Sequence, residues 1–140
     1  MQIGMIFAAA AALSVAMPST VLAQAPAEPP GATVTLYRAA PGHQVMLLQW
    51  LAQQERAAAA AGVPASQLYV HQNGDSWDYL LISPDLTDAQ DDAVDAAAKR
   101  LGIPTGPGVG IELRKHLAWH SDTLAAGPTS VAEYLKRIGQ

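Results

Sequence analysis

The chain has 140 residues, no cysteine, and a formal net charge of −4 from 8 basic and 12 acidic side chains. The lack of cysteine excludes disulfides, thiol catalysis and a lipid anchor on a cysteine. A mildly acidic chain without a basic cluster is not typical of nucleic-acid-binding proteins, and the length suffices for one hydrophobic core but not for two.

The N-terminal segment has features of a secretory signal peptide. It contains no acidic or basic side chain, carries an apolar run at residues 6–15, and has small residues before a cleavage point at Ala23. The apolar run is short for a membrane span, which needs about 20 residues, although an uncleaved anchor is the alternative. We therefore expect a signal peptide at residues 1–23, a flexible leader at 24–31, and a single periplasmic or secreted domain at 32–140.

The first two elements of the domain follow from two different periodicities. Residues 33–38 alternate polar and apolar side chains, which predicts a strand with Val34 and Leu36 facing the core. Residues 43–61 repeat apolar side chains at spacings of three and four, which predicts a helix that Gly62 ends.

Residues 68–83 predict a β-hairpin. Two apolar runs flank the polar turn of residues 73–76, and an Asn-Gly step between such runs is a strong hairpin signal. If the aliphatic side chains face the helices, the aromatic ones share the opposite face of the sheet, which needs a cover because such rings are rarely left in water. That face would carry Tyr37, Tyr69, His71, Trp77 and Tyr79.

Capping residues and glycines delimit the remaining elements. Thr87 or the following aspartate caps a predicted helix over residues 88–101, with acidic residues early and basic residues late, as the helix dipole prefers. The Gly- and Pro-rich residues 103–110 predict a connecting loop. Residues 109–120 alternate and predict a strand, with a helix as the alternative because some apolar residues are also helically spaced. Thr129 or Ser130 is expected to cap a short final helix that ends at Arg137.

The order strand, helix, strand, strand, helix, strand, with a C-terminal helix, predicts an α+β fold. It is the ferredoxin-like βαββαβ arrangement, an antiparallel sheet with its helices on one face. The chain also resembles the dimeric α+β barrel superfamily, in Tyr37, Arg38, Pro41, Gly42 and His43 and in the hairpin at residues 74–79. In that superfamily two sheets pack face to face around a cavity. The resemblance implies a homodimer but no single activity, because members include cofactor-free monooxygenases, haem enzymes and binding proteins.

Two histidines near the C-terminal end are candidates for metal binding. His116 and His120 share a face on either a strand or a helix, with Glu112 and Asp122 nearby. Two imidazoles and a carboxylate suit zinc or iron, so His116, His120 and Asp122 are weak candidates for ligands. The segment lacks an HExxH motif, and the alternatives are the lining of a pocket or ordinary surface positions. We expect no cofactor.

Two histidines are candidate catalytic bases, namely His71 and His116, because the imidazole pKa lies near neutrality. For His71 the alternative is a structural hydrogen bond in a dimer interface. Asp75 and Asp78 flank the hairpin turn, where carboxylates usually accept backbone N–H groups, and a catalytic pair is the alternative.

These features predict an exported homodimer that binds a small organic molecule in a polar-aromatic cavity between its sheets. The alternatives are a cofactor-independent monooxygenase-like enzyme and a non-catalytic protein-interaction module. No nucleic acid is expected as a partner and, after signal cleavage, no membrane. The predicted ligand-binding side chains are Tyr37, Tyr69, His71, Trp77, Tyr79, Arg114, His116 and His120.

Overall fold

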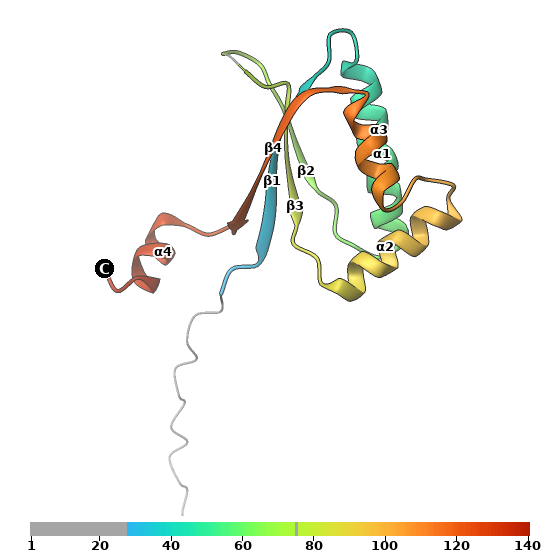
Figure 1. The fold of residues 1–140 in the computed structure, drawn as a ribbon. Helices are drawn as coiled ribbons and strands as arrows, with labels where there is room; N and C mark the ends of the chain where they lie inside the picture. The colour runs from blue at the N-terminus through green and yellow to red at the C-terminus, as the bar shows by residue number, and fades with distance from the viewer. Residues whose placement is uncertain (1–27, 75) are drawn as a thin grey trace, which may run out of the picture.

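The computed structural model describes residues 28–74 and 76–140, so the predicted signal peptide lies outside the described residues. One antiparallel sheet has the strand order β2-β3-β1-β4, and helices α1, α2 and α3 lie together on one side of it (Figure 1). This confirms the ferredoxin-like fold. The strands are β1 (Gly31–Ala39), β2 (Gln67–Val70), β3 (Tyr79–Pro84) and β4 (Leu117–Ala126). The helices are α1 (Gln44–Ala60), α2 (Asp88–Arg100), α3 (Pro107–Arg114) and α4 (Val131–Arg137).

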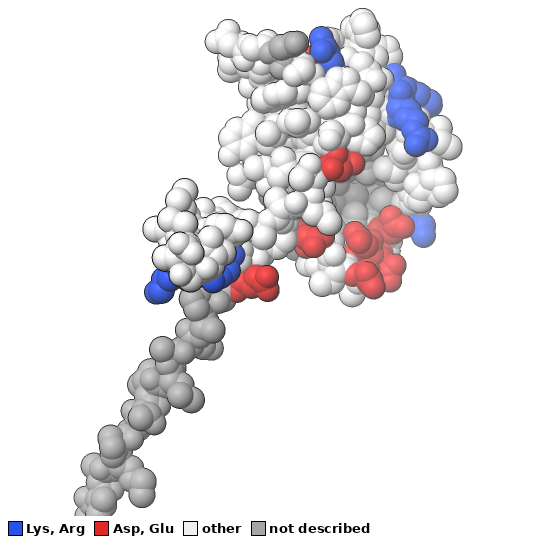
Figure 2. Space-filling view, turned by 60° about the vertical axis from the view of Figure 1, so that its left-hand side comes forward, with Lys and Arg blue, Asp and Glu red and all other residues white. Residues whose placement is uncertain are grey.

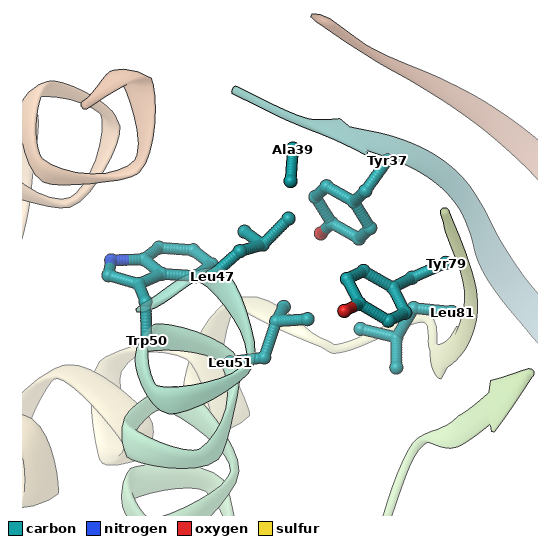
Figure 3. Close-up of a cluster of buried hydrophobic side chains, with 7 residues drawn as sticks. All are labelled: Tyr37, Ala39, Leu47, Trp50, Leu51, Tyr79 and Leu81. Carbon is teal, nitrogen blue, oxygen red and sulfur yellow. The ribbon is translucent and has the colours of Figure 1, made fainter. Parts of the chain in front are cut away.

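The side of the sheet that packs against the helices differs from the predicted one. Tyr37 of β1 lies opposite Tyr79 of β3, and these side chains are only 7% and 6% exposed. Together with Leu81 they pack against Leu47 and Leu51 of α1 (Figure 3). The prediction that the tyrosines lie on the face away from the helices was therefore wrong.

The aliphatic partners of these tyrosines occupy the open face of the sheet. Val34 pairs with Ile82 and Leu36 with Leu80, and all of them are only partly buried. The prediction that Val34 and Leu36 face the core was wrong as well. Alternation separates the side chains of a strand into two sets but does not say which set the helices cover. Here the covered set is the one with the aromatic rings, which bury the larger area.

The hairpin is confirmed, with a longer connection than predicted. β2 ends at Val70 and β3 begins at Tyr79, so His71 and Trp77 lie in the connection and not in the strands. Asp78 holds the connection against β1, because its backbone N–H donates to the carbonyl oxygen of Tyr37 at 2.8 Å.

The segment predicted as one strand over residues 109–120 contains two elements. It is helical in α3 and extended only from the start of β4, so the strand prediction was wrong for its first half. Pro107 occupies the first turn of α3, where its fixed φ and missing N–H suit a helix start. The predicted loop at residues 103–110 is shorter for the same reason.

Both predicted N-caps at the later helices are present. The Thr87 side chain accepts the N–H of Gln90 at α2, and the Ser130 side chain accepts the N–H of Glu133 at α4. These caps confirm the helices over residues 88–100 and 131–137, since each satisfies a backbone donor that the helix leaves unpaired. Within residues 28–74 and 76–140, the helices are all too short or too polar to cross a bilayer.

Candidate functional site

A pocket of about 830 Å³ lies between the helices and the covered side of the sheet. Tyr37 and Leu81 line it from β1 and β3, Leu51 from α1 and Val94 from α2. The turn after α1 adds Val63 and the residues that follow it. The volume falls within the range of roughly 300–1,000 Å³ that is typical of small-molecule sites.

Small side chains keep this space open. Ala58 and Ala59 line the pocket from α1, where larger residues would fill it. The buried hydrophobic residues form two clusters, one around Leu47 and the tyrosines and one around Ala57, Ala98 and Ile103. Ala58 is half-buried and Ala59 is exposed, so the space opens to solvent and is not an enclosed void in the core. A bound apolar molecule would shield the apolar side chains of the wall from water.

The pocket wall contains few polar groups. The hydroxyl groups of Ser66 and Ser83 lie 3.0 Å apart and are hydrogen-bonded to each other. Burial raises the pKa of the Tyr37 hydroxyl above its ordinary value of 10.0, and its hydrogen bond with Thr35 opposes this only in part. Tyr37 therefore stays neutral at physiological pH and contributes a hydroxyl dipole.

Two further residues of the pocket wall carry buried donors that lack an acceptor within the described part of the chain. These donors are Trp50 Nε1 and Gln54 Nε2. In Figure 3 the indole nitrogen of Trp50 is turned away from both tyrosines. An unsatisfied buried donor costs about 1–3 kcal/mol, so a small movement that brought either group to a ligand oxygen would be favoured.

A polar cluster lies beside the pocket on β1 and β4. The Thr35 hydroxyl donates to Asp122 Oδ1 at 2.7 Å, and His120 Nε2 lies 3.4 Å from Asp122 Oδ2. The His120 ring stacks on Tyr37 with ring centroids 6.3 Å apart. Of these residues, only Thr35 was not predicted. Its partner Asp122 is 87 positions away in the sequence, and this pairing depends on the register of β4.

His116 and His43 form a separate pair, with their Nδ1 atoms 3.4 Å apart. His116 Nε2 also lies 3.8 Å from Glu112 Oε1 on α3. Considering residues 28–74 and 76–140 alone, no group of three or more His, Asp or Glu side chains is placed to hold a metal ion. His116 and His120 thus have different partners, and the structure gives the predicted metal site no further support.

The remaining predicted site residues are dispersed. His71 Nε2 lies 2.6 Å from the carbonyl oxygen of Asn73, and its ring is tilted against Trp77 with centroids 4.7 Å apart. Tyr69 pairs with Leu80 on the open face and is 51% exposed. Arg114 is exposed at the end of α3. The eight predicted ligand-binding residues therefore do not gather on one face, and their part in ligand binding stays a prediction.

No protein-family model and no curated protein sequence matches the chain. Solved structures do resemble it. A dimeric ferredoxin-like protein of unknown function from Thermobifida fusca YX aligns with a TM-score of 0.47 and 10% identity, over 71% of this chain and 92% of that one. An uncharacterized NIPSNAP domain protein from Burkholderia xenovorans gives 0.41 and 13% identity, over 72% and 96%.

A third similar structure is a putative antibiotic biosynthesis monooxygenase from Chloroflexus aurantiacus J-10-fl. It aligns with a TM-score of 0.36 and 19% identity, over 72% of this chain and 97% of that one. Because all three TM-scores are below 0.5, we take neither a family nor an activity from these structures. The class that the chain itself defines is an α+β protein with a ferredoxin-like βαββαβ sheet.

Proposed function

We propose that the protein binds a small, mainly apolar organic molecule in the pocket between α1, α2 and the sheet. The observation that carries this proposal is the pocket of about 830 Å³ inside a domain of this size. This location differs from the cavity between two sheets that the sequence suggested, because Tyr37 and Tyr79 face the helices.

The wall of the pocket indicates the chemistry of the ligand. Leu51, Leu81 and Val94 would contact an aliphatic or aromatic body. The unpaired donors of Trp50 and Gln54 favour a ligand that also carries an oxygen acceptor. At the exposed rim, Glu55 and Arg56 have opposite charges, so charge at the rim does not select an anion over a cation.

The setting that we propose is an exported homodimer. Export rests on the signal-like residues 1–23. The homodimer rests on the open face of the sheet, where Val34, Leu36, Leu80 and Ile82 form an apolar patch that none of the described helices covers. Contiguous apolar patches of this kind commonly mark interfaces.

Native mass spectrometry of residues 24–140, purified from the exporting host, tests both parts of the proposal. We expect a dimer that carries added mass, which would identify the ligand. A protein that never retains an organic molecule, and that also fails to bind the probe 1-anilinonaphthalene-8-sulfonate, would contradict the binding function. It would favour the alternative of a protein-interaction module.

A matched pair of variants locates the site. Ala58→Phe places a ring in the pocket, whereas Ala60→Phe adds the same ring on α1 at an exposed residue that does not line it. We expect Ala58→Phe to weaken probe binding at least tenfold and Ala60→Phe to leave it within twofold. Equal effects of both variants would place the site elsewhere.

The monooxygenase-like alternative required His71 or His116 as a proton acceptor. Neither residue lines the pocket, and each already has a neighbour at hydrogen-bonding distance, Asn73 for His71 and His43 for His116. Binding is therefore the function that the geometry supports best.

A further inference from the structure

α4 is an amphipathic helix with an apolar stripe that residues 28–74 and 76–140 leave exposed. Val131, Tyr134, Leu135 and Ile138 recur at spacings of three and four, which places them on one side of the helix. Their exposed fractions are 78%, 51%, 43% and 52%. We call these four residues the α4 stripe. No residue of α4 is buried.

The other side of α4 faces its own chain. Glu133, Lys136 and Arg137 line a groove together with Pro29 and Pro30, the residues just before β1. On a helix with 3.6 residues per turn, these polar positions lie opposite the α4 stripe. Within the described part of the chain, the α4 stripe is therefore directed away from the residues that α4 contacts.

α4 is too short to owe its stability to helix propensity alone. It spans seven residues from Val131 to Arg137, whereas isolated helices shorter than about 12–15 residues are marginal in water. The cap at Ser130 helps, but packing of the apolar side is the main source of stability for such helices. A second surface over the α4 stripe would supply that packing.

The same chain also has an apolar surface on the open face of its sheet. On the open face of the sheet, Leu36 and Leu80 form a cross-strand pair beside Tyr69 of β2. Trp119 lies at the other edge, opposite Arg38. Figure 2 turns this side of the molecule toward the viewer and shows few charged side chains over it. In Figure 1, α4 lies on this side, beyond the end of β4 and not over the sheet.

We propose that the α4 stripe of one copy packs on the open sheet face of a second copy, and the reverse. This inference rests on the homodimer proposed above and specifies how it is built. A two-fold dimer is self-complementary, so a chain that carries both an apolar helix and an apolar sheet face covers both at once. A stable interface buries about 800 Å² per partner, or about 20–30 residues, so the four residues of the α4 stripe would not suffice alone and the sheet face has to take part.

A matched pair of double variants tests the packing in the chain of residues 24–140. Leu135→Gln with Ile138→Gln makes the α4 stripe polar, whereas Lys136→Gln with Arg137→Gln introduces the same residues on the opposite side. By analytical ultracentrifugation we expect the first pair to raise the dimer dissociation constant at least tenfold. The second pair should change it less than twofold.

Engineered disulfides give a second measurement, which the absence of native cysteine makes unambiguous. Leu36→Cys with Tyr134→Cys should form a covalent dimer under oxidation, and Leu36→Cys with Lys136→Cys should not. A dimer that survives the stripe variant and gives no cross-link would overturn the α4 packing while leaving the homodimer intact. A wild-type chain that is monomeric would overturn both.

Discussion

Asp78 and Ala39 are joined by a hydrogen bond in which the backbone N–H of Ala39 donates to Asp78 Oδ2 at 2.8 Å. Ala39 is the last residue of β1 and is only 5% exposed. Asp78 also accepts the N–H of His71 on its carbonyl oxygen at 3.0 Å. The Asp78 side chain thus links the hairpin connection to the end of β1 by a hydrogen bond, as predicted for a carboxylate that flanks a turn.

Asp78→Ala should therefore lower the free energy of unfolding. The substitution leaves the buried N–H of Ala39 without an acceptor, and a donor in that state costs about 1–3 kcal/mol. Asp78→Asn keeps an acceptor oxygen and should recover most of the loss. Urea denaturation followed by tryptophan fluorescence measures both. An Asp78→Ala protein as stable as the wild type would show that water replaces the carboxylate.

Substitution of Leu47 tests whether the hydrophobic cluster beneath α1 is the main core of the protein. Its side chain is fully buried, at 0% exposure, and it packs with Tyr37, Trp50 and Leu81. Leu47→Ala should cost about 2–5 kcal/mol of unfolding free energy, which is the usual range for this change in a core. Leu101→Ala is the control, because Leu101 is 41% exposed and surface changes usually stay within about 0.5 kcal/mol.

Local signals in the sequence were sufficient for the N-terminal ends of α2 and α4, whereas α3 was predicted as loop and strand. The caps at Thr87 and Ser130 depend on hydrogen bonds within three residues, so they can be predicted without knowledge of the fold. The face of the sheet that α1 covers is different, because alternation in β1 is equally compatible with Leu36 or Tyr37 toward the helix.

The candidate site was harder to predict for two physical reasons. Ala58 and Ala59 line the pocket, whereas an alanine tract in a helix predicts only helix propensity. The bond between Thr35 and Asp122 needs the register of β4 against β1. The register could not be predicted because the sequence does not define where β4 begins. His120 and Asp122 were identified because they are close in sequence.

The buried tyrosines predict loss of stability at alkaline pH. Burial raises the pKa of Tyr37 and of Tyr79 above 10.0, so the folded protein retains these protons at a pH where the unfolded chain loses them. The contribution of these two tyrosines to the free energy of unfolding is therefore fully present below about pH 10. It is lost as the pH rises through their pKa values in the folded protein. Tyr37→Phe should flatten this decline in thermal unfolding curves. An unchanged pH profile in that variant would assign the effect to other groups.

Glu133 predicts a change at acid pH that is confined to α4. The backbone N–H and the hydroxyl of Ser130 donate to its carboxylate and lower its pKa below the ordinary 4.5. A depressed pKa contributes stability above about pH 4.5, and this is lost as the pH falls through the folded-state value. The box at α2 uses Gln90 in the same position and does not titrate.

The two capping boxes can be compared by NMR. Between pH 6 and pH 3, the Cα chemical shifts of residues 131–137 should move toward random-coil values, while those of residues 88–100 are lost only when the whole domain unfolds. Glu133→Gln copies the α2 box and should remove the selective effect. If α4 packs on a second copy, the same acid step should also raise the dimer dissociation constant of the wild type more than that of Glu133→Gln. Equal responses of both proteins would show that the Glu133 cap does not affect the dimer interface.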